Sequence, residues 1–195
     1  MPAGTAYYIC APSGDTGSLF VDAAEELGPL RQTIVWVKDR PVLARQDYNW
    51  QHEVLLYGWI LGASHTFHGK AESTVWQIDR PRGSAAHPTM KPVALVERVL
   101  RNSTLAGQLV IDPFLGSGTT LIATERLGRR CFGIELDPGF ASVAVERWEQ
   151  YTGKRAERLA DEVSAEYKTP RFQRQWGAAL EAHRALRAEQ SLGSR

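Results

Sequence analysis

A glycine-rich segment in the second half of the chain has the residue types and spacing of a cofactor-binding loop. Residues 112–120 (DPFLGSGTT) lie between a run that predicts a strand and a run that predicts a helix. The glycines would let the backbone approach a ligand closely, and the amino end of the helix would offer unpaired N–H groups. Glu135 follows at the end of the next predicted strand, where an acid can accept hydrogen bonds from ribose hydroxyls. The unit therefore predicts a site for a nucleoside-containing ligand.

Two common phosphate-binding patterns do not fit this loop. A dinucleotide fingerprint needs a third glycine, and Leu121 stands in its place. A P-loop needs Gly-Lys-Ser or Gly-Lys-Thr, which the chain lacks here. A tight turn without a binding function remains the alternative.

Three segments together resemble the β-group of S-adenosylmethionine (SAM)-dependent DNA methyltransferases, which methylate adenine N6 or cytosine N4. They are residues 87–92 (HPTMKP), 112–120 (DPFLGSGTT) and 135–138 (ELDP), in the order and spacing of the family. The resemblance covers about residues 5–153. It implies an α/β fold with a Rossmann-like methyltransferase sheet and flanking helices, SAM as the cofactor, and DNA methylation of the restriction-modification kind.

The resemblance also assigns roles to residues of the cofactor site. Glu135 would bind the ribose hydroxyls of SAM. His87, Thr89 and Lys91 would line its methionine end, where a lysine suits a carboxylate; a surface lysine beside a helix is the alternative for Lys91. The residues that would surround the methionine and adenosine parts are Asp112, Phe114, Gly116, Ser117, Gly118 and Thr119.

Double-stranded DNA is the partner that the family implies. Residues 47–53 (DYNWQHE) resemble the segment that lines the pocket of the target base. Tyr48 and Trp50 would stack on a flipped base, although core or rim aromatic residues are an equal alternative. Arg80 and Arg82 are candidates for phosphate contacts, with ordinary surface charge as the alternative.

A motif on which the chemistry of this family depends is absent from the sequence. The family holds the exocyclic amine with an Asp/Asn/Ser-Pro-Pro-aromatic motif at the end of a central strand. The ten prolines of this chain are all isolated. We therefore expect no catalytic residues, an N-terminally incomplete domain that lacks a central strand, and impaired catalysis. Three remedies are open for the missing strand: direct pairing across the gap, a strand from a homo-oligomer or complementing chain, or a segment upstream. A non-catalytic SAM- or nucleic-acid-binding remnant, or half of a split enzyme, is the alternative function.

Hydrophobic patterning places these segments on alternating strands and helices, which is typical of an α/β protein with a parallel sheet. Residues 58–80 favour hairpins. Pro92 is expected at the first helical position, and Asp137 is expected to cap a helix that Gly153 ends. The predicted strands are residues 5–11, 33–37, 52–57, 108–111 and 131–134, and the predicted helices span 18–27, 92–100, 119–127 and 137–153.

Length and composition set limits on the whole chain. Its 195 residues suit one domain, predicted at residues 1–153, followed by a helical or partly disordered tail at 154–195. The net charge of +1 gives no global basic field, but a local patch is enough to bind DNA. The two cysteines show no metal or disulfide spacing, which fits a reducing cytoplasm. No metal site and no membrane span is expected.

Overall fold

The computed structural model describes residues 1–43, 45, 47–81 and 90–159. Internal contacts divide the chain into two units, Met1–Lys154 and Arg155–Arg195. The helices and strands assigned in the described residues all lie in the first unit. In the second unit, residues 155–159 form no helix or strand, and the remainder of the predicted tail lies outside the described residues.

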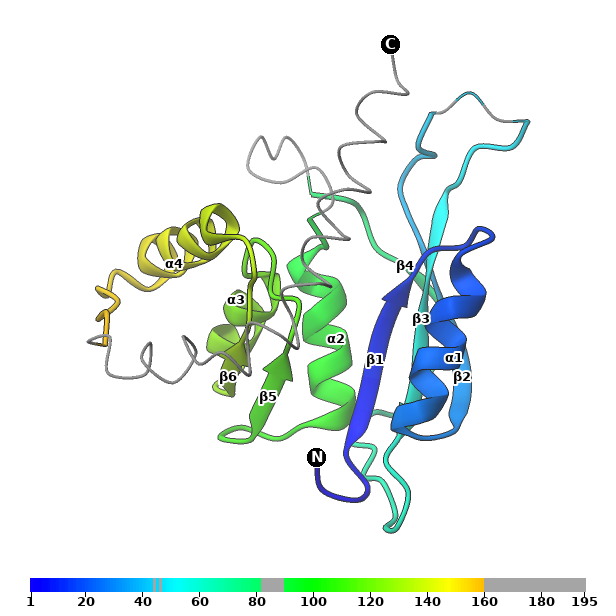
Figure 1. Cartoon of the computed structure of the whole chain (residues 1–195), viewed down its shortest axis with the longest axis horizontal. Coiled ribbons are helices and arrows are strands. Elements are labelled where there is room, and N and C mark those ends of the chain that lie inside the picture. Colours follow the sequence, from blue (N-terminus) through cyan, green and yellow to red (C-terminus); the bar gives the residue numbers. More distant parts are fainter. Residues whose placement is uncertain (44, 46, 82–89, 160–195) are drawn as a thin grey trace, which may run out of the picture. The chain divides into compact units, whose positions relative to one another are not determined.

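Four strands form a mixed sheet in the first half of the chain (Figure 1). They are β1 (Ala6–Ala11), β2 (Leu30–Val37), β3 (His52–Trp59) and β4 (Val75–Gln77), in the order β1-β3-β2-β4. The predicted positions of the first three strands are confirmed, but a purely parallel sheet is wrong, because β3 runs antiparallel to both β1 and β2. No helix connects β2 to β3 in the described residues, and a parallel connection would need a crossover of that kind.

The prediction of hairpins across residues 58–80 is wrong. In the described part of this segment the only strand after β3 is β4, and it pairs in parallel with β2. The segment packs on the helix that follows it, and within the segment the His65 ring stacks on the Trp59 ring at 3.7 Å. The His68 N–H donates to the Asn102 carbonyl at 2.7 Å, and a side chain at Gly69 would meet the Asn102 amide oxygen.

Helices cover both faces of this sheet. On one face, α1 (Gly17–Leu27) buries Ala24 against Tyr7, Ala11 and Leu56. On the other face, α2 (Val93–Ser103) buries Leu95 in the larger cluster. Pro92 has extended backbone and is the N-cap of α2, so the helix begins at Val93, one position after the predicted first helical residue Pro92. The larger cluster contains Ile34, Trp36, Leu55, Tyr57, Trp76 and Leu95.

The second half of the chain forms a strand–helix–strand–helix unit. Strands β5 (Leu109–Asp112) and β6 (Arg130–Gly133) pair in parallel, and α3 (Thr119–Arg126) connects them. Helix α4 (Pro138–Thr152) follows. The Asp137 side chain accepts hydrogen bonds from the Gly139 and Phe140 N–H groups, and Gly153 ends the helix in the left-handed region, so both predicted ends are confirmed.

The two sheets do not pair with each other in the described residues. Strand β1 is an edge of the four-stranded sheet, and β5 is an edge of the two-stranded sheet. Both strands run in the same direction (Figure 1). This arrangement agrees with the expectation that a central strand is missing between the strand at Leu109 and the strand at Ala6.

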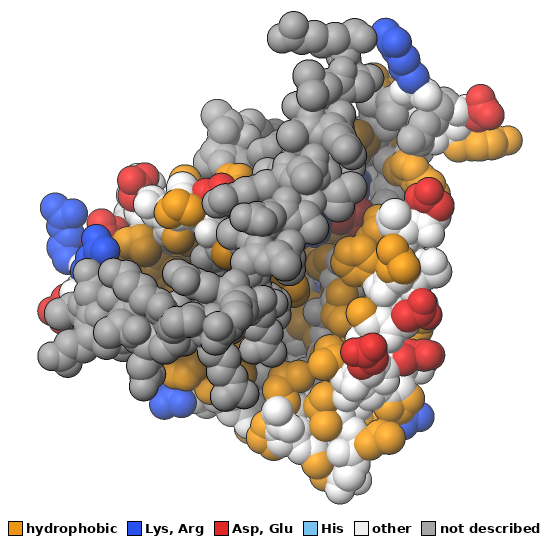
Figure 2. All heavy atoms as spheres, viewed as in Figure 1, with side chains coloured by type: hydrophobic (Ala, Val, Ile, Leu, Met, Phe, Trp, Pro, Cys, Tyr) orange, Lys and Arg blue, Asp and Glu red, His pale blue; other side chains and the backbone are white. Residues whose placement is uncertain are grey.

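The outer face of α1 is acidic. Asp22, Glu25 and Glu26 are exposed there, and acidic side chains gather along this edge in Figure 2. A negative helix face repels a phosphate backbone. This face of α1 is therefore unsuited to contact with nucleic acid.

Candidate functional site

Charged residues of the candidate site gather at one edge of the fold, which is formed by the ends of the strands. Strands β1, β2, β4, β5 and β6 end at this edge, and the antiparallel strand β3 begins there. Ligands of open α/β sheets bind outside the carboxyl ends of their strands. Lys38, Glu53, Asp112 and Glu135 all lie at or next to these strand ends.

The glycine-rich loop makes a tight return between β5 and α3. The Asp112 Oδ1 atom accepts the Phe114 N–H at 3.0 Å, and the Gly118 N–H donates to the Leu115 carbonyl at 3.0 Å. Gly116 and Gly118 have φ of +55° and +80°, in the left-handed region that glycine adopts readily. The loop sequence therefore has a defined backbone reason for its glycines.

Glu135 is tied to this loop by its carboxylate. Its Oε2 atom accepts the Gly116 N–H at 2.7 Å, and its Oε1 atom accepts the Asp137 N–H at 2.9 Å. Carboxylate oxygens have about two acceptor positions each, so each oxygen keeps capacity for a ligand hydroxyl. Glu135 can therefore hold the glycine-rich loop and, at the same time, accept hydrogen bonds from the two hydroxyls of a diol.

The six loop residues predicted to surround the cofactor are brought together, but they do not share one environment. Phe114 is 88% exposed, whereas Ser117, Gly118 and Thr119 are buried. Gly118 packs against α4, where an added Cβ would lie 2.9 Å from the Ala144 Cβ atom. Phe114 is available to cover a ligand, while the last three residues fix the position of the loop.

Sequence reasoning missed Arg147, which lies on α4. Its Nη1 atom donates to the Ser117 carbonyl and, at 3.0 Å, to the Ser117 hydroxyl oxygen. Burial holds the pKa of the Arg147 guanidinium below its usual range. An arginine in an amphipathic helix gives no signal of a partner 30 residues away.

Replacing Arg147 with methionine is expected to lower the free energy of unfolding by about 1–3 kcal/mol, because the buried Ser117 acceptors lose their donor. Urea denaturation followed by circular dichroism measures this change. Arg126→Met is the matched control, since Arg126 pairs with Glu97 at 3.3 Å on an exposed surface and should cost less than about 1 kcal/mol. Equal losses in the two variants would contradict the assignment of Arg147 as a support of the loop.

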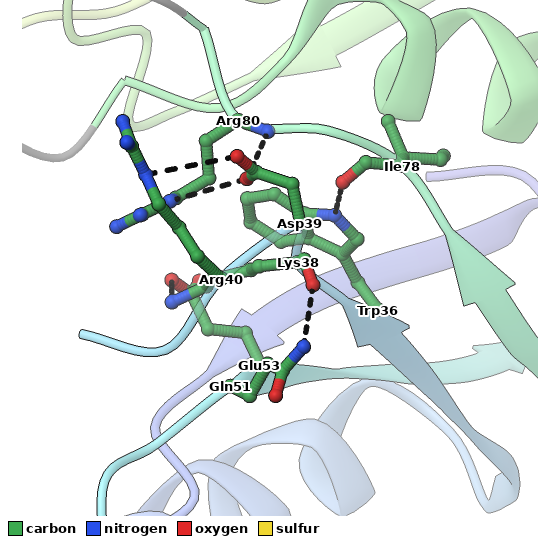
Figure 3. A network of polar contacts seen from close by, with 8 residues as sticks. All are labelled: Trp36, Lys38, Asp39, Arg40, Gln51, Glu53, Ile78 and Arg80. Carbon is green, nitrogen blue, oxygen red and sulfur yellow. Dashed lines mark hydrogen bonds and ion pairs between the residues drawn. The ribbon is translucent and has the colours of Figure 1, made fainter.

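Lys91 connects strand β3 of the four-stranded sheet with the first residue of α3. Its Nζ atom is 2.8 Å from the Glu53 Oε2 atom on β3, and its carbonyl accepts the Thr119 hydroxyl at 3.3 Å. The other Glu53 oxygen lies 2.9 Å from the Nζ atom of buried Lys38 (Figure 3). Burial raises the pKa of the Glu53 carboxyl, but hydrogen bonds and charge from Lys91 and Lys38 outweigh it and leave this pKa below its ordinary value.

The predicted DNA-contacting residues lie in different environments. Tyr48 is 89% exposed, and Trp50 makes an edge contact with His52 at a ring distance of 5.5 Å. The Arg80 Nε atom lies 3.5 Å from an Asp39 oxygen, which also accepts the Arg80 backbone N–H (Figure 3). That backbone hydrogen bond, followed by smaller effects that include the Arg80 charge, lowers the pKa of Asp39.

Three of the predicted residues cannot be placed. His87, Thr89 and Arg82 lie outside the described residues. Across the part of the chain that the structure describes, no three His, Cys, Asp or Glu side chains gather as a metal site would require. The helices described there are too short or too polar to cross a membrane.

A family model and curated relatives match this chain. Residues 63–146 match the model described as "DNA methylase". The type II methyltransferase M2.DpnII of Streptococcus pneumoniae is 34% identical over 124 residues, which cover 60% of this chain and 42% of that protein. The type II methyltransferase M.ScaI of Streptomyces caespitosus is 36% identical over 89 residues, which cover 42% of this chain and 29% of that protein. The chain thus spans less than half the length of these relatives.

Solved structures share the fold. The crystal structure of an M1.HpyAVI–SAM complex superposes with a TM-score of 0.65 at 28% identity, and the match covers 75% of this chain and 76% of that one. The chain therefore shares its overall fold with a protein whose structure was solved with SAM.

Proposed function

Because this chain resembles the C-terminal portion of the N6/N4 DNA methylases, we propose that it serves SAM-dependent methylation of the exocyclic amine of adenine (N6) or cytosine (N4) at specific DNA sites. One observation carries the proposal: the glycine-rich loop after β5 closes on Glu135, with the Gly116 N–H on the Glu135 carboxylate at 2.7 Å. This geometry presents a carboxylate, backbone N–H groups and an exposed aromatic ring around one loop.

SAM would bind along this loop and supply its sulfonium methyl group. Glu135 accepts hydrogen bonds from the ribose hydroxyls, for which it keeps acceptor capacity. Lys91 would pair with the methionine carboxylate, and His87 and Thr89, which lie outside the described residues, are assigned to the same end of the cofactor by the resemblance. Phe114 covers the ligand from the solvent side. The loop residues assigned to the cofactor are Asp112, Phe114, Gly116, Ser117, Gly118 and Thr119.

Double-stranded DNA would approach the same edge, away from the acidic face of α1. Tyr48 and Trp50 are exposed and offer flat surfaces to a flipped base, a contact worth about 1–3 kcal/mol per base. Arg80 and Arg82 would contact phosphates. Arg80 is already paired with Asp39, so its net contribution to phosphate binding is expected to be small.

We further propose that transfer by residues 1–195 alone is impaired. No Pro-Pro dipeptide is present to hold the exocyclic amine, so no residue of this chain is assigned a catalytic role. Strands β1 and β5 also each have one side without a neighbouring strand in the described residues. A homo-oligomeric partner or a complementing chain would supply both the strand and the acceptor-holding group. The cytoplasm is the compartment that suits this function and the free cysteines.

A second candidate is a non-catalytic SAM- or nucleic-acid-binding remnant, or half of a split enzyme. The absence of a Pro-Pro dipeptide favours it, because the residues assigned to the cofactor are present in the sequence while the motif that would hold the acceptor amine is not. A complementing chain that restores transfer would favour the split enzyme over the remnant.

The isolated protein is expected to bind SAM and to transfer little or no methyl group to DNA. Titration calorimetry measures SAM binding, and incubation of double-stranded DNA with methyl-labelled SAM measures transfer. Efficient transfer would contradict the impairment but support the function. Failure to bind SAM would contradict the proposed function itself. Any methylated base is identified as N6-methyladenine or N4-methylcytosine by mass spectrometry.

A further inference from the structure

We infer that Glu53 and Lys38 are positioning residues that hold the Lys91 ammonium at the methionine end of the SAM site. The inference rests on the proposed function, because it assigns to Lys91 the carboxylate of that cofactor. Neither Glu53 nor Lys38 belongs to the glycine-rich loop. Both lie where the strands of the four-stranded sheet begin or end: Lys38 directly follows β2, and Glu53 is near the start of β3.

The geometry assigns each Glu53 oxygen to one lysine. Oε1 lies 2.9 Å from the Lys38 Nζ atom, and Oε2 lies 2.8 Å from the Lys91 Nζ atom. A carboxylate that is held on both oxygens has little freedom to rotate. The direction of the Lys91 side chain is therefore set by β3, a rigid element that lies outside the segment carrying Lys91.

Lys38 prevents Glu53 from leaving this position. The Lys38 side chain is only 7% exposed, and its Nζ atom lies over the Trp36 ring at 5.5 Å. Its backbone is fixed as well, because the Lys38 N–H donates to the Gln51 carbonyl at 2.8 Å and its own carbonyl accepts the Gln51 side chain (Figure 3). A buried ammonium without its carboxylate is strongly unfavourable. Glu53 is thus held at the site by the need to neutralise Lys38.

Lys91 keeps the capacity to bind an anion. An ammonium has three N–H donors, and Glu53 takes one of them. The Lys91 side chain is 29% exposed, so its remaining donors can be reached. Two cations share one carboxylate in this network, which leaves one positive charge that Glu53 does not neutralise. The Thr119 hydroxyl on the Lys91 carbonyl keeps this charge beside the glycine-rich loop.

The test compares two ligands in the full chain. SAM has the aminobutyrate group with its carboxylate, whereas 5′-methylthioadenosine has the adenosine part and lacks that group. Glu53→Gln is expected to weaken SAM binding about tenfold, because Lys91 loses its charged partner and its direction. The affinity for 5′-methylthioadenosine should change by less than about twofold. Calorimetry of both ligands measures this split.

Two simpler roles for Glu53 predict different results. If Glu53 acted only through its charge, its removal would tighten SAM binding, since it repels the carboxylate. If it were only a structural link, both ligands would weaken together. Either result would overturn the inference while wild-type SAM binding still supported the proposed function. Wild-type protein that binds no SAM would overturn both.

Two variants make the result unambiguous. Glu53→Asp keeps the charge that Lys38 requires and shortens the reach by one methylene, so it is measured as well in case Glu53→Gln does not fold. It should weaken SAM binding severalfold and leave 5′-methylthioadenosine binding unchanged. Glu97→Gln is the matched control, because Glu97 of α2 also bridges two cations, Arg101 at 2.8 Å and Arg126 at 3.3 Å, and Arg126 is at the end of α3 opposite the loop. It should leave both affinities unchanged.

Discussion

Gly118→Ala is expected to abolish measurable SAM binding and to lower the free energy of unfolding by about 2–5 kcal/mol. An added Cβ would lie 2.9 Å from the Ala144 Cβ atom and 3.1 Å from its Cα atom, so the backbone of α4 or of the loop must move. The φ of +80° adds about 1–2 kcal/mol of strain for any residue with a side chain. Overpacking of a well-packed contact typically costs about 1–3 kcal/mol more. Urea denaturation and SAM calorimetry measure the two effects.

Gly107→Ala separates the two causes. Gly107 has the same φ of +80°, but nothing lies within 4 Å of a Cβ placed there. This variant should therefore show only the conformational cost of about 1–2 kcal/mol and should keep its SAM affinity. If both variants lost stability equally, or if Gly118→Ala bound SAM normally, the contact between the loop and α4 would not set the geometry of the site.

Local chemistry explains why the second half of the molecule could be predicted. The strand–loop–helix–strand unit from Leu109 to Gly133 follows from short-range patterns of apolar residues and glycines. The same holds for the start of α4, where the Asp137 side chain accepts N–H groups two and three residues ahead. Each of these interactions joins residues that are close in the sequence.

Contacts between distant residues explain what was missed. Strand β4 pairs with β2 in parallel, and the Trp36 indole N–H donates to the Ile78 carbonyl 42 residues later. Aromatic and polar residues alternate in residues 58–80, as they do in hairpins. This local pattern therefore predicted pairing within the segment instead of pairing with β2. Arg147 supports Ser117 over a similar separation, and neither residue type reveals the other.

The same distinction applies within the site. The resemblance assigned Lys91 a ligand, and the structure adds two groups that fix its position, Glu53 and the Thr119 hydroxyl. The sequence offered no reason to connect Glu53, near the start of a β-strand, with a lysine 38 residues further along (91 − 53). Positioning residues of this kind can be identified only from the folded structure, in which the ends of the strands lie side by side.

Glu135→Ala is expected to weaken SAM binding by about a hundredfold or more. The Glu135 carboxylate would accept hydrogen bonds from both ribose hydroxyls, and a hydrogen bond to a charged group contributes about 1.5–3 kcal/mol. The substitution also leaves the Gly116 and Asp137 N–H groups without their acceptor, which should lower the free energy of unfolding by about 1–3 kcal/mol. Calorimetry and urea denaturation measure the two changes separately.

The 2′,3′-dideoxy analogue of SAM distinguishes ligand contact from loop support. The wild-type protein should bind this analogue far more weakly than SAM, whereas Glu135→Ala should bind both about equally. Glu125→Ala is the control, because Glu125 connects α3 to the Trp148 indole and to Lys154 and should leave SAM affinity unchanged. If Glu135→Ala weakened both ligands by the same factor, Glu135 would act only by shaping the loop, and the ribose would be bound elsewhere.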